Sequence, residues 1–431
     1  MEYLSRSASR RPIVTAPRER EKQMAIRLKI ARTAEELDAV FRLRYEVYVE
    51  ERGKFAANPD NPRIVDHFDA VPDTASVVAY DDDLAVATMR INRDGPLGLP
   101  AEAHFDFSDL RRRLQEEQVA QQKPFNLVCG SMLAIRKGYR NRRNVILALF
   151  KEAAGLMYGW GVSHVIGAVR PDTYSIYERL GFVPVAEPVY HDKIGDYLLP
   201  IVAQFEKGFA WRFFNSVRSR EGRLWLDEFA PELERVLLKP GEVLFRQGEV
   251  ASHAYVVDDG WISISRTDPE GNEMVLANLA PGAFFGEVAI FDSERRSATA
   301  TALTATELIS IERERLLQVV REQPEKMDQL LAHFAQRIRQ TDELAMALAF
   351  APQGRRVEKV LEELWRSSVP DRKNSRVRVA RVGPAQIAKK AQVREDEVRG
   401  VLEIRKAHGC LDYGDKVIRF YREPQFEVKE G

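Results

Sequence analysis

Cysteine is almost absent from this chain of 431 residues, which has only Cys129 and Cys410. Two cysteines so far apart in sequence argue against a disulfide framework and against a cysteine-based zinc site. The seven histidines are scattered singly, without a close pair at the spacing of metal ligands. We therefore expect no metal site.

Long apolar runs and an excess of either charge are also absent. No run reaches the roughly 18 apolar residues that a bilayer-spanning helix needs, and the N-terminus has arginine and serine where a secretory signal needs an apolar core. The 65 basic and 65 acidic residues cancel. This composition predicts a soluble cytoplasmic protein rather than a polybasic or acidic disordered one. The length predicts two to four domains.

The most informative stretch is residues 284–300, which combine the groups that bind a phosphodiester. Gly286 lets the backbone approach a ligand, Glu287 can accept from a ribose hydroxyl, and Arg296, nine residues later, can neutralise a phosphate. The small residues that follow offer backbone N–H groups to the remaining oxygens. No single residue is diagnostic, but their order indicates a phosphate-binding cassette.

This order resembles the cassette of cyclic-nucleotide-binding domains, the family of the bacterial cyclic-AMP receptor protein and of protein kinase A regulatory subunits. The likeness extends over about residues 228–350, with glycine at the expected turns. It implies a β-roll that binds cAMP, or alternatively cGMP, as an effector; a β-roll without ligand would usually lack the glutamate or the arginine. The residues it assigns to the nucleotide are Gly286, Glu287, Val288, Ala289, Arg296, Ser297, Ala298, Thr341 and Asp342.

The N-terminal half has a different pattern. Residues 1–25, rich in arginine, serine and proline, predict a mobile arm. A capping-box-like start at Thr33 predicts a helix, and alternating residues predict a following hairpin. The later elements expected are a strand at 127–135, a basic loop at 136–143, a helix at 145–158, a strand at 164–169 and a helix at 174–180. This succession suggests an α+β acyltransferase.

Residues 133–143 are similar to the acyl-donor-binding strand and loop of the GNAT acyltransferase superfamily, and 177–182 match its Tyr-x-x-x-Gly-Phe motif. The resemblance covers about residues 26–205 and implies Tyr177 as the general acid that protonates the leaving thiolate. Both glycines of the family's Arg-x-x-Gly-x-Gly are missing, so arginine side chains would replace a backbone cradle; loss of activity is the alternative. The implied donor-binding residues are Ile135, Arg136, Arg140, Arg142 and Arg143.

Residues 41–51, 66–69 and 88–90 resemble the branch of acyl-homoserine-lactone synthases and N-acyl amino acid synthases. This implies acyl carrier protein, or acyl-CoA, as donor and an amino acid-like amine as acceptor. Residues implied on the acceptor side are Arg44, Asp66, Asp69 and Arg90, and the candidate bases are Glu46, Asp66 and Asp69. An ion cluster that only stabilises the fold is an equally weighted alternative for the arginine and the aspartates.

After Pro324, apolar residues at alternating steps of four and three predict a long helix with the seam of a two-stranded coiled coil, and therefore a homodimer. The seam consists of Met327, Leu331, Phe334, Ile338, Thr341, Ala345 and Leu348. Before it, an apolar periodicity predicts a linker helix at 206–228.

Residues 351–431 resemble a winged helix-turn-helix domain, with a wing near 416–421. The resemblance implies DNA binding through Arg394, Glu395 and Arg399. Three adjacent carboxylates at the DNA-facing start of the recognition helix would be repelled by phosphate, so a retained structural or regulatory module is the alternative.

The predicted fold class is therefore α+β multidomain. It comprises a GNAT-like domain (26–205), the linker helix, a cyclic-nucleotide-binding β-roll with its dimer helix (229–350) and a winged helix-turn-helix (351–431). The predicted function is a cAMP-regulated N-acyltransferase. The alternatives are a cAMP-responsive transcription regulator whose acyltransferase-like domain senses an acyl ligand, and a cAMP-regulated protein lysine acetyltransferase.

Overall fold

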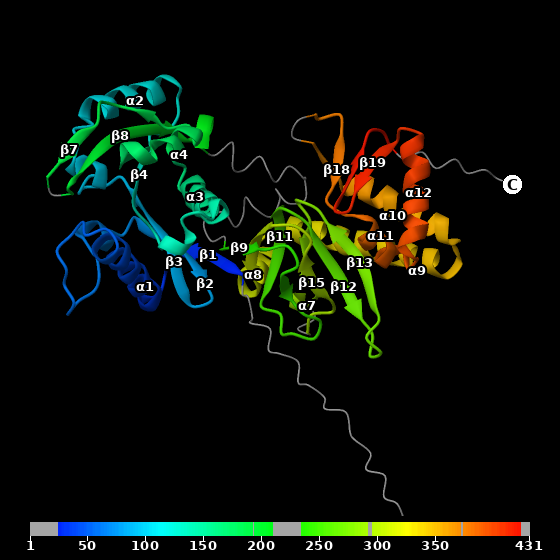
Figure 1. The fold of residues 1–431 in the computed structure, drawn as a ribbon. Helices are drawn as coiled ribbons and strands as arrows, with labels where there is room; N and C mark the ends of the chain where they lie inside the picture. The colour runs from blue at the N-terminus through cyan, green and yellow to red at the C-terminus, as the bar shows by residue number, and fades with distance from the viewer. Residues whose placement is uncertain (1–24, 193, 210–233, 292–294, 372–373, 424–431) are drawn as a thin grey trace, which may run out of the picture.

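The computed structural model describes residues 25–423 except 193, 210–233, 292–294 and 372–373 (Figure 1). The predicted arm, apart from its last residue, and most of the predicted linker helix lie outside the described residues. Within the described part of the chain, no helix is both long and apolar enough to cross a membrane.

The first domain consists of a twisted sheet with helices on its faces (Figure 1). Its elements are β1 (Ile26–Ile30), α1 (Ala34–Tyr45), β2 (Thr74–Asp81), β3 (Leu84–Arg93), α2 (Ser108–Ala120), β4 (Leu127–Ile135), α3 (Arg143–Gly159), β5 (His164–Val169), α4 (Tyr174–Arg179), β6 (Val183–Pro184), β7 (Val189–His191) and β8 (Asp196–Gln204). The predicted capping box is confirmed, because Thr33 and Glu36 each accept a hydrogen bond from the other's backbone N–H. Helix α2 was not predicted.

The second domain is a β-roll followed by two helices. Its elements are β9 (Glu234–Leu238), β10 (Val243–Phe245), β11 (His253–Asp259), β12 (Ile262–Thr267), β13 (Glu273–Leu279), β14 (Phe284–Phe285), α7 (Val288–Phe291), β15 (Thr299–Ala302), β16 (Thr306–Glu312), α8 (Arg313–Glu322) and α9 (Pro324–Phe350). Strands β10, β15, β12 and β13 form one sheet, while β14, β11, β16 and β9 form the facing layer. A shared apolar core lies between them.

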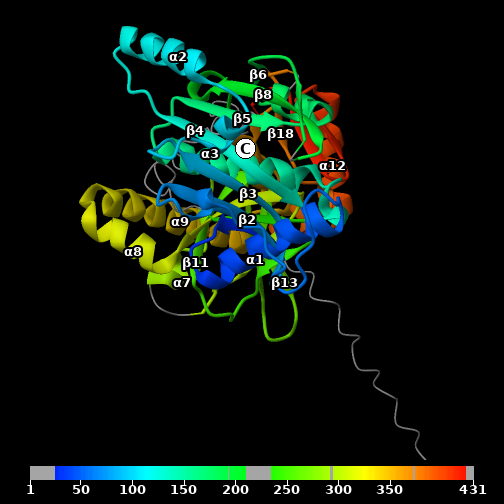
Figure 2. The same ribbon diagram turned by 90° about the vertical axis from the view of Figure 1, so that its left-hand side faces the viewer.

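The two domains share one continuous sheet, in the order β14-β11-β16-β9-β1-β2-β3-β4-β5-β8-β6 (Figures 1 and 2). Strand β1 pairs with β2 on one side and with β9 on the other, with Ile26 opposite Leu237 and Leu28 opposite Arg235. Because side chains alternate along β9, Leu237 packs in the core of the first domain and Val236 in that of the β-roll. The sequence-based division into separate domains did not anticipate this junction.

The C-terminal part contains α10 (Gln353–Ser367), α11 (Pro384–Ala391) and α12 (Glu395–Ala407). These helices accompany a four-stranded antiparallel sheet of β17 (Val369–Pro370), β18 (Arg378–Ala380), β20 (Val417–Phe420) and β19 (Leu411–Gly414). The strand predicted at 376–382 is limited to β18. Trp261 of the β-roll is buried in the same core as these helices, so the two parts pack against each other.

Candidate functional sites

The predicted phosphate-binding cassette forms a buried site beside β11. Gly286 follows β14 with φ +78°, a left-handed conformation that favours glycine. A Cβ atom there would lie only 2.9 Å from Nη1 of Arg296. Glu287 has no exposed surface and Arg296 is 4% exposed. The structure thus brings these three predicted residues together in the protein interior.

Arg296 is held by neutral groups. Its Nη1 donates to the carbonyl of Gly286 (2.7 Å) and its Nη2 to that of His253 (2.6 Å). The guanidinium also lies over the Phe245 ring, 4.1 Å from its centroid. Burial lowers the pKa of Arg296, and among the described residues no carboxylate forms an ion pair with it. A buried cation is stabilised by a bound anion, so this side chain can accept a phosphate.

Glu287 provides an unused acceptor. Its Oε1 lies 3.0 Å from Nη1 of Arg337 and 3.5 Å from Nε2 of His333, both on α9. Although burial opposes ionisation, these two neighbours lower the pKa of Glu287, so it is a carboxylate. Its Oε2 is buried without a hydrogen-bond partner among the described residues. A ligand hydroxyl would supply the missing donor.

The other predicted nucleotide residues surround this pair or lie on α9. Val288 and Ala289 begin α7, and Ser297 and Ala298 follow Arg296. Thr341 and Asp342 are exposed on α9, and the Thr341 hydroxyl donates to the carbonyl of Arg337. Their contacts with a nucleotide stay predictions. Sequence reasoning missed Arg337 and His333, because only folding brings α9 against the cassette.

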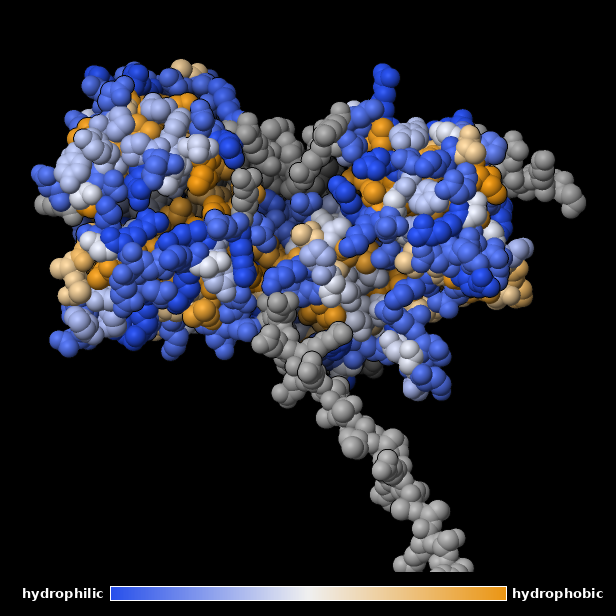
Figure 3. Space-filling model, in the orientation of Figure 1, coloured by the Kyte–Doolittle hydropathy of each residue, from blue (hydrophilic) through white to orange (hydrophobic). Residues whose placement is uncertain are grey.

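The candidate acyl site lies where the sheet of the first domain divides. Parallel strands β4 and β5 pair only from Leu127 to Cys129 of β4 and from His164 to Ile166 of β5. Beyond these residues β4 stays with β3, and β5 with β8. Figure 3 shows a hollow with hydrophobic residues between the two halves of this domain. Such an opening can admit an extended acyl chain.

A bulge in β4 faces this opening. Between the pairs Thr88–Ala134 and Arg90–Ser131, two residues of β4 oppose one of β3, and Met132 has φ +50°. A bulge of this kind takes a backbone group out of the sheet ladder. The hydroxyl of Tyr48, in the helical turn that follows α1, donates to the carbonyl of Leu133 at 2.9 Å and thereby holds the bulge. Sequence reasoning did not assign Tyr48 to the candidate site.

Tyr177 lies on α4, which follows β5 after a single 3-10 turn at Pro171–Thr173. Its ring packs edge-on against Phe150 and Phe182, with centroids 5.7 and 5.8 Å away. Burial raises the pKa of the Tyr177 phenol, and the nearby Tyr48 adds to this shift. The phenol therefore stays protonated and can donate a hydrogen bond to a developing thiolate.

The predicted acceptor-side residues form an ion network. Arg44 donates to Asp69 at 2.8 Å, and both side chains are almost fully buried. Arg90 binds both oxygens of Asp66 and also contacts Asp69 at 2.9 Å. This burial favours the fold-stabilising alternative for Arg44 and Asp69, and it argues against Asp69 as a base. Asp66 is 30% exposed and is the member that a substrate can reach.

The predicted donor loop is held by ion pairs to the residues that directly follow α1. Arg136 contacts Glu46 at 2.6 Å, and Arg140 pairs with Glu51. Arg142 lies over the ring of Tyr139 and 3.7 Å from Asp81. The side chain of Arg143 lies outside the described residues, and Ile135 ends β4. These arginines are therefore paired within the protein, which the charge pattern alone did not indicate.

Burial raises the pKa of Glu46, although the positive charge of Arg136 opposes this shift. A raised pKa makes a carboxylate a better proton acceptor near neutral pH. Among the three candidate bases, Glu46 is therefore the one whose environment fits the role best.

The predicted DNA-reading residues at the start of α12 are satisfied internally. Arg394 pairs with Asp396, and Arg399 contacts Glu395 at 2.6 Å and Asp415 at 3.6 Å. Since these arginines are exposed, water screens the pairs and a stronger anion can replace the carboxylates. DNA contact by Arg394, Glu395 and Arg399 stays a prediction.

Comparison with known proteins assigns the two larger parts. Residues 39–203 match the family model of the N-acyl amino acid synthase FeeM, and residues 235–323 match that of the cyclic nucleotide-binding domain. A CRP-like cAMP-activated global transcriptional regulator of Mycobacterium tuberculosis is 33% identical over 133 residues, which are 31% of this chain and 59% of the relative. The cyclic AMP receptor protein of Thermus thermophilus is 35% identical over 136 residues, or 32% and 63% of the two chains.

The chain thus spans about three fifths of the length of these curated relatives. Among solved structures, FeeM, an N-acyl amino acid synthase from uncultured soil microbes, is similar with a TM-score of 0.34 and 15% identity, covering 42% of this chain and 93% of that one. The chain therefore joins an N-acyl amino acid synthase FeeM domain, at residues 39–203, to a cyclic nucleotide-binding domain at residues 235–323.

Proposed function

We propose that this chain is an N-acyltransferase regulated by a cyclic nucleotide, with cAMP favoured over cGMP. It would move an acyl group from acyl carrier protein or acyl-CoA to the amine of an amino acid-like acceptor. The observation that carries the proposal is that one sheet contains both the divided strands beside Tyr177 and the strand that lies against Arg296. A change at one site is therefore mechanically linked to the other.

The acyl-transfer step follows from the groups at the opening. An acceptor amine attacks the thioester carbon, and Glu46, directly or through water, takes the amine proton. The backbone of the β4 bulge would face the carbonyl oxygen that becomes negative. The C–S bond then breaks, and Tyr177 donates to the leaving sulfur. Because its pKa is raised, Tyr177 serves best as a hydrogen-bond donor that stabilises the thiolate.

The nucleotide would bind at two groups of the cassette, the guanidinium of Arg296 and Oε2 of Glu287, which has no partner among the described residues. Its cyclic phosphate would replace the carbonyl acceptors of Arg296, since a hydrogen bond to a charged oxygen is stronger than one to a neutral carbonyl. A ribose hydroxyl would donate to Oε2 of Glu287. Residues Thr341 and Asp342 of α9, or of a second copy across the predicted seam, would then lie toward the base.

The remaining predictions belong to the same proposal. The divided sheet and the bulge support a GNAT fold for residues 26–205, and the helices α10–α12 with their sheet support a winged helix-turn-helix at 351–431. The latter, together with regulators among the relatives, favours a second candidate function, a cAMP-responsive transcription regulator. The three adjacent carboxylates in the first turn of α12, Glu395, Asp396 and Glu397, make it the weaker candidate, because phosphate repels them.

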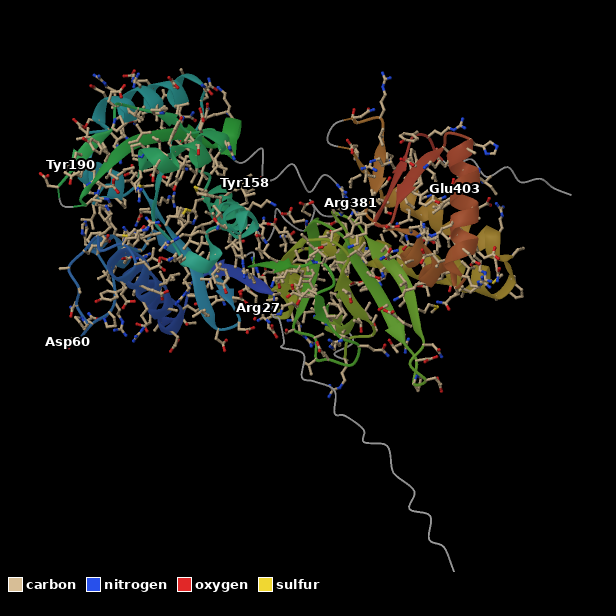
Figure 4. The ribbon with its side chains drawn as sticks, in the orientation of Figure 1. Arg27, Asp60, Tyr158, Tyr190, Arg381 and Glu403 are labelled. Atoms are coloured by element: carbon tan, nitrogen blue, oxygen red, sulfur yellow. The ribbon has the colours of Figure 1, made fainter. Side chains whose placement is uncertain are left out.

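A thiol-release assay tests the proposal. Purified full-length protein is incubated with acyl carrier protein thioesters or acyl-CoA and a mixture of amino acids, with and without cAMP. We expect thiol release that depends on an amine and changes with cAMP. Tyr177→Phe should slow the release by about 10²–10⁴-fold, whereas Tyr190→Phe, at an exposed edge strand, should leave it unchanged (Figure 4). No release under any condition, with sequence-selective DNA binding, would favour the regulator; acetylated protein lysines would favour a lysine acetyltransferase.

A further inference from the structure

Five ionisable side chains meet in the interior where the two domains join, and none belongs to either candidate site. We refer to them as the joint cluster: Lys151 and Glu152 of α3, Arg235 of β9, Asp258 of β11 and Glu307 of β16. None is more than 14% exposed. The sheet pairing of β1 with β9 brings α3 over the strands of the β-roll (Figures 1 and 4, where Arg27 marks β1).

The contacts of the cluster cross the domain boundary. Lys151 of the first domain lies 2.6 Å from Glu307 and 3.1 Å from Asp258 of the β-roll. Arg235 lies 2.7 Å from Asp258, 2.9 Å from Glu307 and 3.4 Å from Glu152. Buried ion pairs contribute little net stability compared with apolar packing. They do, however, depend steeply on geometry, so a small displacement of one strand changes the forces on α3.

Strand β11 connects the cluster to the nucleotide pocket. The carbonyl of His253 at its start accepts from Arg296, and the ring of Tyr255 lies beneath the same guanidinium. At its other end, the register against β16 shifts between Val257 and Asp259, and the intervening Asp258 lies in the cluster. When Arg296 exchanges the His253 carbonyl for a phosphate, one end of this strand loses a hydrogen bond.

Helix α3 connects the cluster to the acyl site. It begins at Arg143, at the end of the donor loop, whose Arg136 and Arg140 pair with two glutamates in the segment that follows α1. Lys151 lies two turns into this helix, and Phe150, its neighbour in sequence, packs against Tyr177. A shift of α3 therefore moves both the donor loop and the ring that supports the predicted acid.

From these contacts we propose that the joint cluster transmits nucleotide occupancy from Arg296, through β11 and α3, to the donor loop and Tyr177. The inference rests on the proposed function and names the device that regulates its acyl site. Lys151 is the main link, because it is the only described cation of the first domain that binds both Asp258 and Glu307.

The test must distinguish a loss of coupling between the two sites from a loss of folding. Removing Lys151 alone would leave two buried carboxylates facing one arginine and risks unfolding. The double substitution Lys151→Met/Glu307→Gln instead removes one charge of each sign and keeps the pair of Arg235 and Asp258. The matched control is Lys29→Met, which removes a 31% exposed lysine that joins Glu36 of the first domain to Glu234 of the β-roll.

Two readouts are made on the full-length proteins: calorimetric titration with cAMP, and hydrogen exchange of peptides covering residues 136–150 and 286–300 with and without cAMP. In the wild type and in Lys29→Met, cAMP should change exchange in both segments. In the double variant, cAMP should still bind and still change exchange at 286–300, while the change at 136–150 disappears. The ratio of thiol release with and without cAMP should likewise fall to about one.

The outcomes distinguish the two proposals. If the double variant binds cAMP and keeps the wild-type change at 136–150, or if the wild type binds cAMP without any change there, the joint cluster is not the link. If neither cAMP nor cGMP produces heat with the wild type, the proposed nucleotide regulation itself is overturned. If exchange responds but no thiol is released, the link stands and only the enzymatic part fails.

Discussion

At the scale of single residues, three side chains have hydrogen-bonding groups that a charged or polar ligand would satisfy better than the protein does. Arg296 binds neutral carbonyls, Oε2 of Glu287 has no partner among the described residues, and Tyr177 remains a phenol because burial disfavours its charged form. Each of these features fits a ligand that supplies what is missing.

Arg296→Ala should weaken cAMP binding by roughly ten- to hundredfold, because a charge-assisted hydrogen bond contributes about 1.5–3 kcal/mol. The cAMP affinity of Arg296→Lys should lie between those of the wild type and Arg296→Ala, since lysine keeps the charge and loses the bidentate geometry. Arg266→Ala, at an exposed position of the β-roll, is the control. The affinities are measured by calorimetric titration with cAMP. Equal affinity of the wild type and the three variants would refute the assigned phosphate site.

Tyr177→Phe should lower kcat by about 10²–10⁴-fold while KM for the acyl donor changes little, because general acid catalysis acts in the transition state. The phenylalanine ring keeps the packing against Phe150 and Phe182. A raised KM with unchanged kcat would instead indicate that Tyr177 only binds the donor.

Glu152 should make the free energy of unfolding depend on pH. Burial raises its pKa to about 8, and the opposing charge is Arg235, while Glu234 and Glu307 add to the increase. Above the unfolded-state pKa near 4.5, unfolded chains lose this proton and folded ones keep it until about pH 8. The free energy of unfolding therefore falls as the pH rises between these values, by up to ~1.4 kcal/mol per unit.

Glu152→Gln mimics the protonated form and should remove this contribution. Its melting temperature should rise relative to that of the wild type as the pH increases from about 6 to 8. The control is Glu36→Gln, because the pKa of Glu36 is lowered and it stays ionised throughout this range. If the difference in melting temperature between Glu152→Gln and the wild type stays constant over this pH range, Glu152 is already ionised in the folded protein.

At the scale of elements, α9 has an unusual number of exposed apolar residues. Met327, Leu331 and Ile338 of the predicted seam are 39, 56 and 61% exposed. We expect a second copy to cover them. Leu331→Asp/Ile338→Asp should turn a dimer into a monomer in sedimentation equilibrium, whereas Gln336→Asp, on the opposite side of the helix, should not. A wild type that is monomeric at every concentration would contradict the coiled-coil prediction.

Elements encoded by local patterns were predictable from the sequence, and those that depend on distant contacts were not. The cassette is one contiguous stretch, so Gly286, Glu287 and Arg296 could be assigned to one site directly. The pairing of β1 with β9 leaves no local signal, because about 200 residues separate the strands. For the same reason the partners of Arg136 and Arg140, and the burial of Arg44 and Asp69, emerged only from the structure.

At the scale of the whole molecule, the chain combines an acyltransferase-like sheet and a nucleotide-binding roll in one continuous structure. Regulation requires that the nucleotide bind two states of the acyl site with different affinity. The shared sheet and the joint cluster give this proposed coupling a physical route between the two domains.

The most direct measurement is the rate of thiol release as a function of cAMP concentration, compared with cAMP binding measured by calorimetry on the same protein. We expect the rate to change over the concentration range in which cAMP binds, and Arg296→Ala to move both curves together. A rate that stays constant while cAMP saturates the protein would contradict regulation by the nucleotide.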